Sequence, residues 1–299
     1  ALAVYVTVPP SVKSCIDTEL LKFSYPLMFV TILGTLMHWM DILMLGYFTD
    51  VTTVGLYHPA MRTAGLLQAL IVSFISIFAP LMSQLHSEGD FIEMSHLYKL
   101  VSRWLITFAI PISLVFIIYP SKMMLLFGPD FMASGSVLVL LTVATFIQAA
   151  FGAAGPPLGM SGFTRLLFWN SFGVFILNIV LNVVLIPKYG ILGAAWATLL
   201  SIVAINLIRV IQVRWILKLS FISSKMIKPV LSGVGTGWCL WWIRPLVMDF
   251  HTLVTLLFVS IVSIMIFGFG LWIMKFEPED KDFLAGLGIL RKSLKKKGK

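Results

Sequence analysis

Long apolar stretches recur along the chain, and they constrain its fold more than any other feature of the sequence. They run over 21–47, 61–85, 97–119, 135–154, 165–186, 191–217, 229–248 and 252–274. A helix needs about 20 such residues to cross a hydrocarbon core of about 30 Å, and lipid requires its backbone to be hydrogen-bonded internally. Strands of a membrane barrel would be about half as long and would alternate. The pattern predicts an all-α, polytopic membrane helix bundle of about eight transmembrane helices.

The composition agrees with lipid as the main solvent of this chain. Apolar residues make up 59% and charged residues only 12%, whereas a soluble domain has about 25% charged residues. The net charge of +9 comes from residues between apolar stretches and in the C-terminal tail. Because no compact basic face is present, we expect membrane lipids and not nucleic acid as partners.

The positive charges are distributed unequally between the two predicted sides of the membrane. One side holds four of the 22 Lys and Arg residues, namely Arg62, Lys122, Lys188 and Arg244. The other eighteen, including the basic tail at 276–299, lie on the opposite side. The positive-inside rule predicts that this second side is cytoplasmic. Both ends of the chain are then cytoplasmic, as an even number of spans requires.

Proline and glycine mark several predicted helix ends. Tyr57-His58-Pro59 precedes the span at 61–85, and Pro187-Lys188-Tyr189-Gly190 separates 165–186 from 191–217. These combinations are typical of turns and of first helical turns. Pro80 and Pro111 lie inside spans, where we expect them to kink the helix.

Five segments occur in an order that resembles a known family of transporters. The first, 20–62, begins LLKFSYPL and continues with Asp41, LGYF, VGLY and Arg62; 79–90, 126–131 and 158–165 follow. The fifth, 177–201, reads LNIVLNVVLIPKYGILGAAWATLLS. Together they resemble the C-terminal part of polysaccharide flippases of the O-antigen or teichoic-acid type. These flippases belong to the multidrug/oligosaccharidyl-lipid/polysaccharide exporter superfamily.

The resemblance implies a domain organisation with a MATE-like fold. Residues 1–20 would form an inter-lobe linker and the stub of a preceding helix, and 21–218 a six-helix C-terminal transporter lobe. Residues 219–275 would add two transmembrane helices, and 276–299 a cytoplasmic basic tail. Because the family's cavity lies between two lobes, we expect a missing N-terminal lobe or a partner chain to complete it.

The resemblance also implies a function. Polysaccharide flippases of this kind move a lipid-linked oligosaccharide, the polysaccharide repeat unit, across the cell (plasma) membrane by alternating access. We find no Walker loop, nucleophile motif or metal-ligand spacing in the sequence. We therefore expect a transporter and not an enzyme, with no cofactor and no metal. Its energy would come from an ion gradient, the membrane potential or removal of the substrate.

Ionisable residues inside a span are the first candidates for the functional site, because they usually face the bundle interior or water. His38 and Asp41 are three residues apart and are expected on one face. Arg62 opens the next predicted span on the same side and could meet Asp41. We consider two roles for Asp41: a structural pair with Arg62 that closes the outer end, or a gating or cation-coupled carboxylate.

Further polar residues are candidates for substrate contacts. Arg62 and Ser73 lie on one helix face, and the Arg62 guanidinium suits the substrate's diphosphate. Arg103 and Arg165 open spans on the inner side, where they would contact lipid headgroups or the substrate. Asn178 shares a face with Ser171 and Asn182, and such side chains commonly hydrogen-bond between helices.

Two other functions fit the same residues. A cation-coupled multidrug antiporter of the same superfamily would use Asp41 as its coupling site. A non-transporting membrane scaffold of a polysaccharide synthesis complex would need no cavity at all. Drug efflux that depends on Asp41 would favour the antiporter, whereas capture of glycosyltransferases without flipping would favour the scaffold.

The predicted orientation is testable by cysteine labelling. With Cys15 and Cys239 replaced by serine, Lys122→Cys is expected to react with an impermeant thiol reagent added outside cells. Lys218→Cys is expected to react only after the membrane is opened, because it lies on the side rich in positive charge. Labelling of both positions from one side would contradict the assigned topology.

Overall fold

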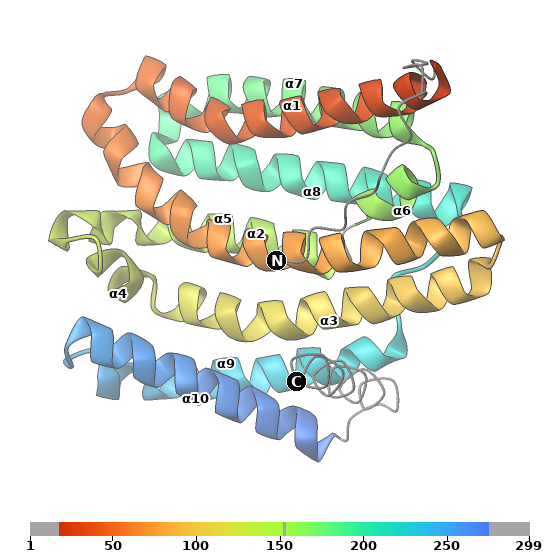
Figure 1. The fold of residues 1–299 in the computed structure, drawn as a ribbon. Helices are drawn as coiled ribbons and strands as arrows, with labels where there is room; N and C mark the ends of the chain where they lie inside the picture. The colour runs from red at the N-terminus through yellow and green to blue at the C-terminus, as the bar shows by residue number, and fades with distance from the viewer. Residues whose placement is uncertain (1–17, 152–153, 275–299) are drawn as a thin grey trace, which may run out of the picture.

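The computed structural model describes residues 18–151 and 154–274. All regular secondary structure in this part of the chain is helical (Figure 1). It contains ten α-helices and two 3₁₀-helices among the described residues, with no strand there. The predicted all-α fold is therefore confirmed. The predicted tail at 276–299 lies outside the described residues. Of the predicted linker at 1–20, residues 1–17 lie outside them as well.

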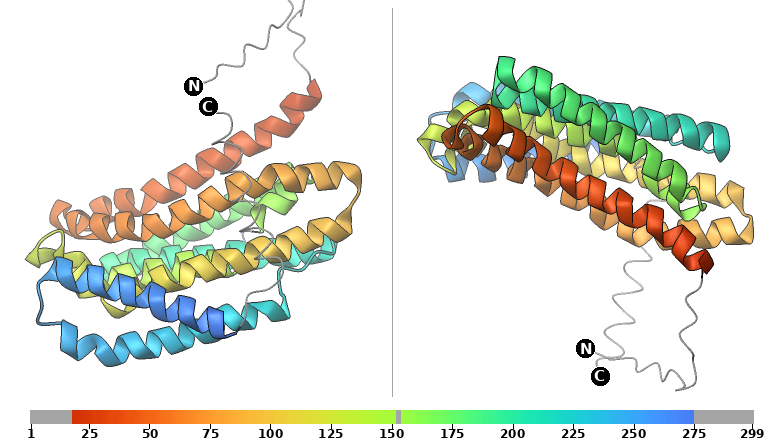
Figure 2. Two further views of the ribbon diagram at one scale, coloured as in Figure 1. Left: turned by 60° about the horizontal axis from the view of Figure 1, so that its bottom comes forward. Right: turned by 90° about the horizontal axis from the view of Figure 1, so that it is seen from above.

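Eight long helices build the bundle, and short helical turns lie in the connections between them. The long helices are α1 (Thr18–Phe48), α2 (Val51–Glu88), α3 (Phe91–Ile118), α5 (Gly135–Ala150), α7 (Thr164–Tyr189), α8 (Ile191–Ile216), α9 (Ile227–Val247) and α10 (Thr252–Ile273). The short ones are α4 (Pro120–Leu125), η1 (Pro129–Ser134), α6 (Gly155–Met160) and η2 (Ser224–Met226). Figure 2 shows the long helices running side by side across the molecule in alternating directions.

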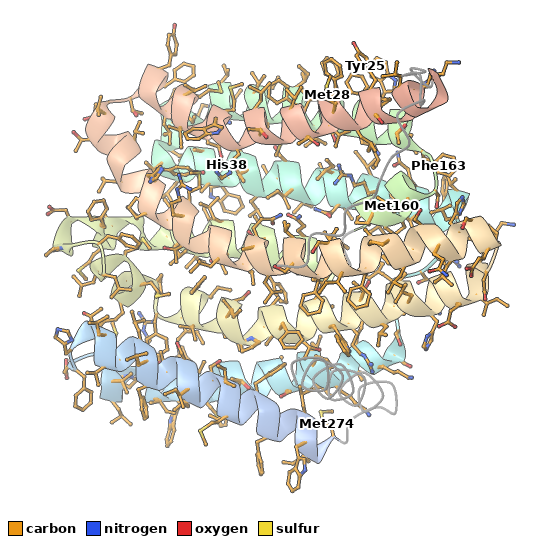
Figure 3. All side chains as sticks on the ribbon, in the orientation of Figure 1. Tyr25, Met28, His38, Met160, Phe163 and Met274 are labelled. Atoms are coloured by element: carbon orange, nitrogen blue, oxygen red, sulfur yellow. The ribbon has the colours of Figure 1, made fainter. Side chains whose placement is uncertain are left out.

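Seven described helices are long and apolar enough to cross a membrane. The long helix that is not among these seven is α9, which contains Lys228, Arg244 and three glycines. Large apolar side chains cover the outside of the bundle, among them Tyr25 and Met28 on α1 (Figure 3). An apolar exterior of this kind is stable in lipid and costly in water.

Two helices begin earlier than the sequence predicted. The start of α2 is Val51 and not 61, because the Asp50 carboxylate caps it by accepting the Thr53 N–H at 3.0 Å. Pro59 lies inside α2, which bends along its length (Figure 1), as helices do at proline. The start of α3 is Phe91 and not 97, because Asp90 caps it in the same way. Arg62 and Arg103 are therefore inside their helices and not at the starts.

The helices α7 and α8 form an antiparallel hairpin. The chain turns between them at Gly190, whose φ of 56° lies in the left-handed region that glycine adopts readily. Pro187, predicted to end the helix, lies inside its last turn. The hairpin packs against α1 on one side and α5 on the other. It therefore contacts both the start and the middle of the chain.

Helix ends gather at two opposite ends of the bundle (Figure 1). One end holds the connections from α1 to α2, α3 to α5, α7 to α8 and α9 to α10. The other end holds the remaining connections and the start of α1. The described loops that the sequence assigns to the two sides of the membrane therefore lie at opposite ends of the bundle. Which end is cytoplasmic stays a prediction.

The helix pair α9 and α10 packs against α3 and α4. Three side-chain donors link the pair to the rest of the bundle. Tyr119 Oη donates to the Leu240 carbonyl at 2.7 Å, and Lys122 Nζ donates to the Phe250 carbonyl at 2.9 Å. Ser263 Oγ on α10 donates to the Pro111 carbonyl at 3.2 Å. Hydrogen bonds and close packing are what hold helices together in lipid. The predicted division between 21–218 and 219–275 stays a prediction.

Close packing of α9 on α3 depends on Gly233. A Cβ atom there would lie 2.8 Å from Ile110 Cγ2, whereas one at Gly235 would meet nothing within 4 Å. Gly233→Val is therefore expected to lower the free energy of unfolding by about 1–3 kcal/mol. Gly235→Val on the same helix is the control and should leave it unchanged. Thermal unfolding in detergent measures both, and equal melting temperatures would contradict the packing role of Gly233.

Candidate functional site

Asp41 lies inside the bundle, on a stretch of α1 that faces α2, α7 and α8. Its side chain is 4% exposed, and it is the one buried carboxylate among the described residues. Tyr57 Oη donates a hydrogen bond to Asp41 Oδ2 at 3.0 Å, and Asn182 Nδ2 donates to Oδ1 at 2.9 Å. The Thr198 hydroxyl also donates to Oδ2. One carboxylate therefore joins four helices through three donors.

Asn178 completes this group, which we call the Asp41 cluster: Asp41, Tyr57, Asn178, Asn182 and Thr198. Asn178 lies one turn before Asn182 on α7, and its Oδ1 accepts a second hydrogen bond from Asn182 Nδ2 at 3.1 Å. Both asparagines are fully buried. The predicted hydrogen bond to another helix is formed by Asn182, which donates to Asp41 of α1, whereas the hydrogen bond of Asn178 is to Asn182 on its own helix.

Some hydrogen-bonding atoms in and beside the Asp41 cluster have no partner among the described residues. Asn178 Nδ2 and Asn182 Oδ1 are buried without a partner, and so is Ser201 Oγ, one turn after Thr198 on α8. No three His, Cys, Asp or Glu side chains gather to hold a metal ion in the described part of the chain. The oxygens at the cluster come from a carboxyl, amides and hydroxyls. Such groups can accept a proton, a water molecule or an alkali cation.

The expected pair between Asp41 and Arg62 is not formed. Arg62 is exposed, and its Nε lies 3.5 Å from His58 Nε2 on the same helix. Arg62 follows Tyr57 by five residues, which turns it about 140° around α2. Because Tyr57 faces Asp41, Arg62 faces away. In the described residues no cation lies within ion-pair distance of Asp41.

His38 and Ser73 also lie outside the Asp41 cluster. His38 is exposed on α1 (Figure 3), and its ring meets that of Trp39 edge-on, with 6.2 Å between centroids. Three residues separate it from Asp41, so the two side chains diverge by about 60° around the helix. One faces inward and the other outward. Ser73 is exposed and donates to the Ala69 carbonyl of its own helix at 2.8 Å.

Arg103 and Arg165 occupy two further places. Arg103 is buried on α3, with 4% of its surface exposed. Arg165 is exposed at the start of α7 and lines an open cleft of about 520 Å³ together with Lys22 and residues 162–166. The structure therefore brings together only Asp41 and Asn178 among the predicted site residues.

A second set of polar contacts lies further along the seam between α7 and α8. Asn170 and Gln212 exchange two amide hydrogen bonds, at 2.6 and 3.0 Å. Arg209 Nη2 donates to Ser171 Oγ at 3.2 Å. We call the interface that carries these contacts and the Asp41 cluster the α7–α8 seam.

Sequence reasoning missed Tyr57, Thr198 and Arg209. A signal existed for Arg209, because it precedes the predicted end of its span by eight residues and so lies two turns inside an apolar helix. It was counted with the loop cations instead. Tyr57 was assigned to a turn before its helix, and Thr198 is a single hydroxyl in an apolar stretch. Neither carried a usable signal.

Comparison with known proteins supports the family resemblance. Residues 2–134 match the family described as polysaccharide biosynthesis protein. A probable low-salt glycan biosynthesis flippase of Haloferax volcanii, Agl15, is 27% identical over 210 residues, which is 69% of this chain and 42% of the relative. The probable flippase AglR of the same organism is 30% identical over 169 residues, 54% of this chain and 35% of the relative.

A third relative is an uncharacterised membrane protein of Methanocaldococcus jannaschii, 24% identical over 206 residues, 66% of this chain and 39% of the relative. The chain thus spans less than half the length of the curated relatives it matches. The predicted resemblance to polysaccharide flippases is confirmed. Seven apolar helices, together with the similarity to these membrane proteins, support a multi-pass membrane protein.

The Asp41 cluster is expected to contribute to stability. Asn182→Ala leaves Asp41 Oδ1 without its donor and should lower the free energy of unfolding by about 1–3 kcal/mol. Asn206→Ala is a matched control, because Asn206 is also buried but bonds only to the Ile202 carbonyl of its own helix. Thermal unfolding in detergent compares the two variants. A smaller loss for Asn182→Ala than for Asn206→Ala would contradict the role given to this hydrogen bond.

Proposed function

We propose that the chain is part of a flippase that moves a lipid-linked oligosaccharide across the plasma membrane by alternating access. We further propose that the Asp41 cluster couples this movement to a proton or a cation. The similarity to named glycan flippases supports the cargo. The observation that carries the coupling is a buried carboxylate that joins four helices without a counter-charge in the described residues.

A protein is needed for this movement because a charged sugar-diphosphate headgroup cannot enter hydrocarbon cheaply without partners. Two halves that rock against each other would open a polar path first to one side and then to the other. The described lobe would be one half. The other half would be an N-terminal lobe or a partner chain, and both ends of this chain would be cytoplasmic.

The coupling follows from the hydrogen bonds of Asp41. An ionised carboxylate accepts from Tyr57, Asn182 and Thr198 at once. A proton on Oδ1 turns that oxygen into an O–H donor, which opposes the contact with the Asn182 Nδ2 donor, while Oδ2 can still accept from Tyr57 and Thr198. Asn182 Oδ1, which has no partner, could then accept. Proton uptake would thereby change how α1 and α2 are held against α7 and α8.

The exposed polar side chains of α1 and α2 are the proposed contacts with the cargo or with the other half. Arg62 and His38 both lie on these two helices and are exposed. Because a guanidinium grips phosphate oxygens with two parallel donors, Arg62 suits the diphosphate of a lipid-linked sugar. Arg165, which is exposed at the start of α7, would interact with phosphate nearer the cytoplasmic end, whereas Arg103 is buried on α3.

One observation favours a second candidate, a cation-coupled multidrug antiporter. A buried carboxylate in a membrane helix would serve coupling equally well with a different cargo. The two functions differ in what is transported. Efflux of cationic dyes from vesicles, without movement of any lipid-linked sugar, would favour the antiporter.

The proposal is tested in vesicles that contain the complete gene product and a labelled lipid-linked oligosaccharide. A proton or sodium gradient is expected to accelerate flipping by the wild type. Asp41→Asn keeps the size of the side chain but removes its titration, so the gradient-driven rate should fall by about tenfold or more.

The matched control is Asp50→Asn, since asparagine also caps helices and Asp50 lies outside the Asp41 cluster. It should flip like the wild type. An Asp41→Asn variant that keeps the full gradient response would refute the coupling role. Absence of flipping in the wild type, with glycosyltransferases captured by the protein, would instead favour a scaffold.

A further inference from the structure

The α7–α8 seam carries a second charged group, Arg209 on α8. Its side chain is partly buried, and Nη2 donates to Ser171 Oγ at 3.2 Å. Nε is buried without a hydrogen-bond partner. No carboxylate among the described residues lies within ion-pair distance of it. Among the described residues, this guanidinium inside a membrane-spanning helix has one neutral hydroxyl, that of Ser171, as its hydrogen-bond partner.

Asp41 cannot neutralise Arg209. Arg209 follows Thr198 by eleven residues, which returns it to nearly the same face of α8 about 16 Å further along the axis. On α7, Ser171 and Asn182 are also eleven residues apart, so they too lie on nearly the same face about 16 Å from each other along the axis. The seam thus holds a carboxylate at one level and a guanidinium at another, too far apart to pair. Gln212 cannot compensate the charge either, because its amide is already engaged by Asn170.

The Arg209 guanidinium lies against the backbone of the helix α6. At Gly155, the first residue of α6, an added Cβ would lie 3.5 Å from Arg209 Nη1 and 3.8 Å from Cζ. A Cβ would therefore meet the guanidinium at ordinary contact distance, whereas the branches of a valine would press on it. Arg209 also lies about two turns from the end of α8, at the end of the bundle with the predicted cytoplasmic loops.

We propose that Arg209 and Ser171 bind a phosphate group. A guanidinium binds two phosphate oxygens through parallel N–H donors, and Nε has no hydrogen-bond partner among the described residues. A bound anion would also remove the cost of an uncompensated charge in the membrane. The phosphate would belong to an anionic lipid headgroup or, if the proposed flippase function holds, to a lipid-linked diphosphate.

The first experiment measures binding of inorganic pyrophosphate to the complete gene product in phosphatidylcholine nanodiscs. Arg209→Gln is expected to weaken binding by about tenfold or more. Arg209→Lys should retain part of it, because it keeps the charge but loses the planar fork. Gly155→Val should weaken it, because the branches of the valine would press on the guanidinium. Arg214→Gln, an exposed arginine on the same helix, is the control and should bind like the wild type.

Melting temperatures without pyrophosphate separate binding from folding. Removal of an uncompensated buried charge is often neutral or stabilising, so Arg209→Gln should melt no lower than the wild type. The proposal is overturned if Arg209→Gln binds pyrophosphate as tightly as the wild type. It is equally overturned if this variant melts lower while Arg209→Lys restores melting without restoring binding, since Arg209 would then be structural.

Two further arms identify the source of the phosphate. Native mass spectrometry from nanodiscs with phosphatidylglycerol reports retained headgroups, and added farnesyl diphosphate stands in for a lipid-linked diphosphate. Loss of either signal in Arg209→Gln supports the site and names its occupant, whereas loss of neither overturns it. Asp41→Asn should leave binding unchanged, so failure of the coupling proposal would not be confused with failure of this one.

Discussion

Hydrocarbon offers no hydrogen bonds, so every polar group in this bundle must find its partners within the protein. This constraint is most severe at Asp41, whose buried carboxylate is served by donors from α2, α7 and α8. The same contacts hold α1 to the hairpin of α7 and α8, where packing of similar apolar surfaces adds little specificity. The position of α1 thus depends on how one carboxylate is hydrogen-bonded.

The same requirement for hydrogen-bond partners applies to the other polar groups along the α7–α8 seam. Amides of Asn170 and Gln212 satisfy each other completely, and they behave as structural contacts between helices. At Asp41 and Arg209 the groups are only partly satisfied by the protein. Partly satisfied polar groups are expensive in an interior of low dielectric constant. A bound ion or ligand would therefore change the free energy of the lobe most at Asp41 and at Arg209.

Helix existence was predictable, but helix ends and side-chain directions were less so. The apolar stretches fixed eight helices because lipid leaves no other regular structure available. The start of α2 was misplaced because Pro59 was interpreted as a turn, although a capping Asp50 stands directly before Val51. That error moved Arg62 to a helix start and placed it opposite Asp41. A shift of a few residues rotates every side chain to another face.

The sequence by itself determined the fold class, the membrane environment, the separation of loop cations between two sides and the resemblance to flippases. These properties depend on composition and on order along the chain. Only the tertiary structure decided that Tyr57, Asn182 and Thr198 surround Asp41, and that Arg209 meets Ser171. Those contacts join residues up to 157 positions apart. They depend on how four helices are rotated and placed against one another, which hydropathy does not encode.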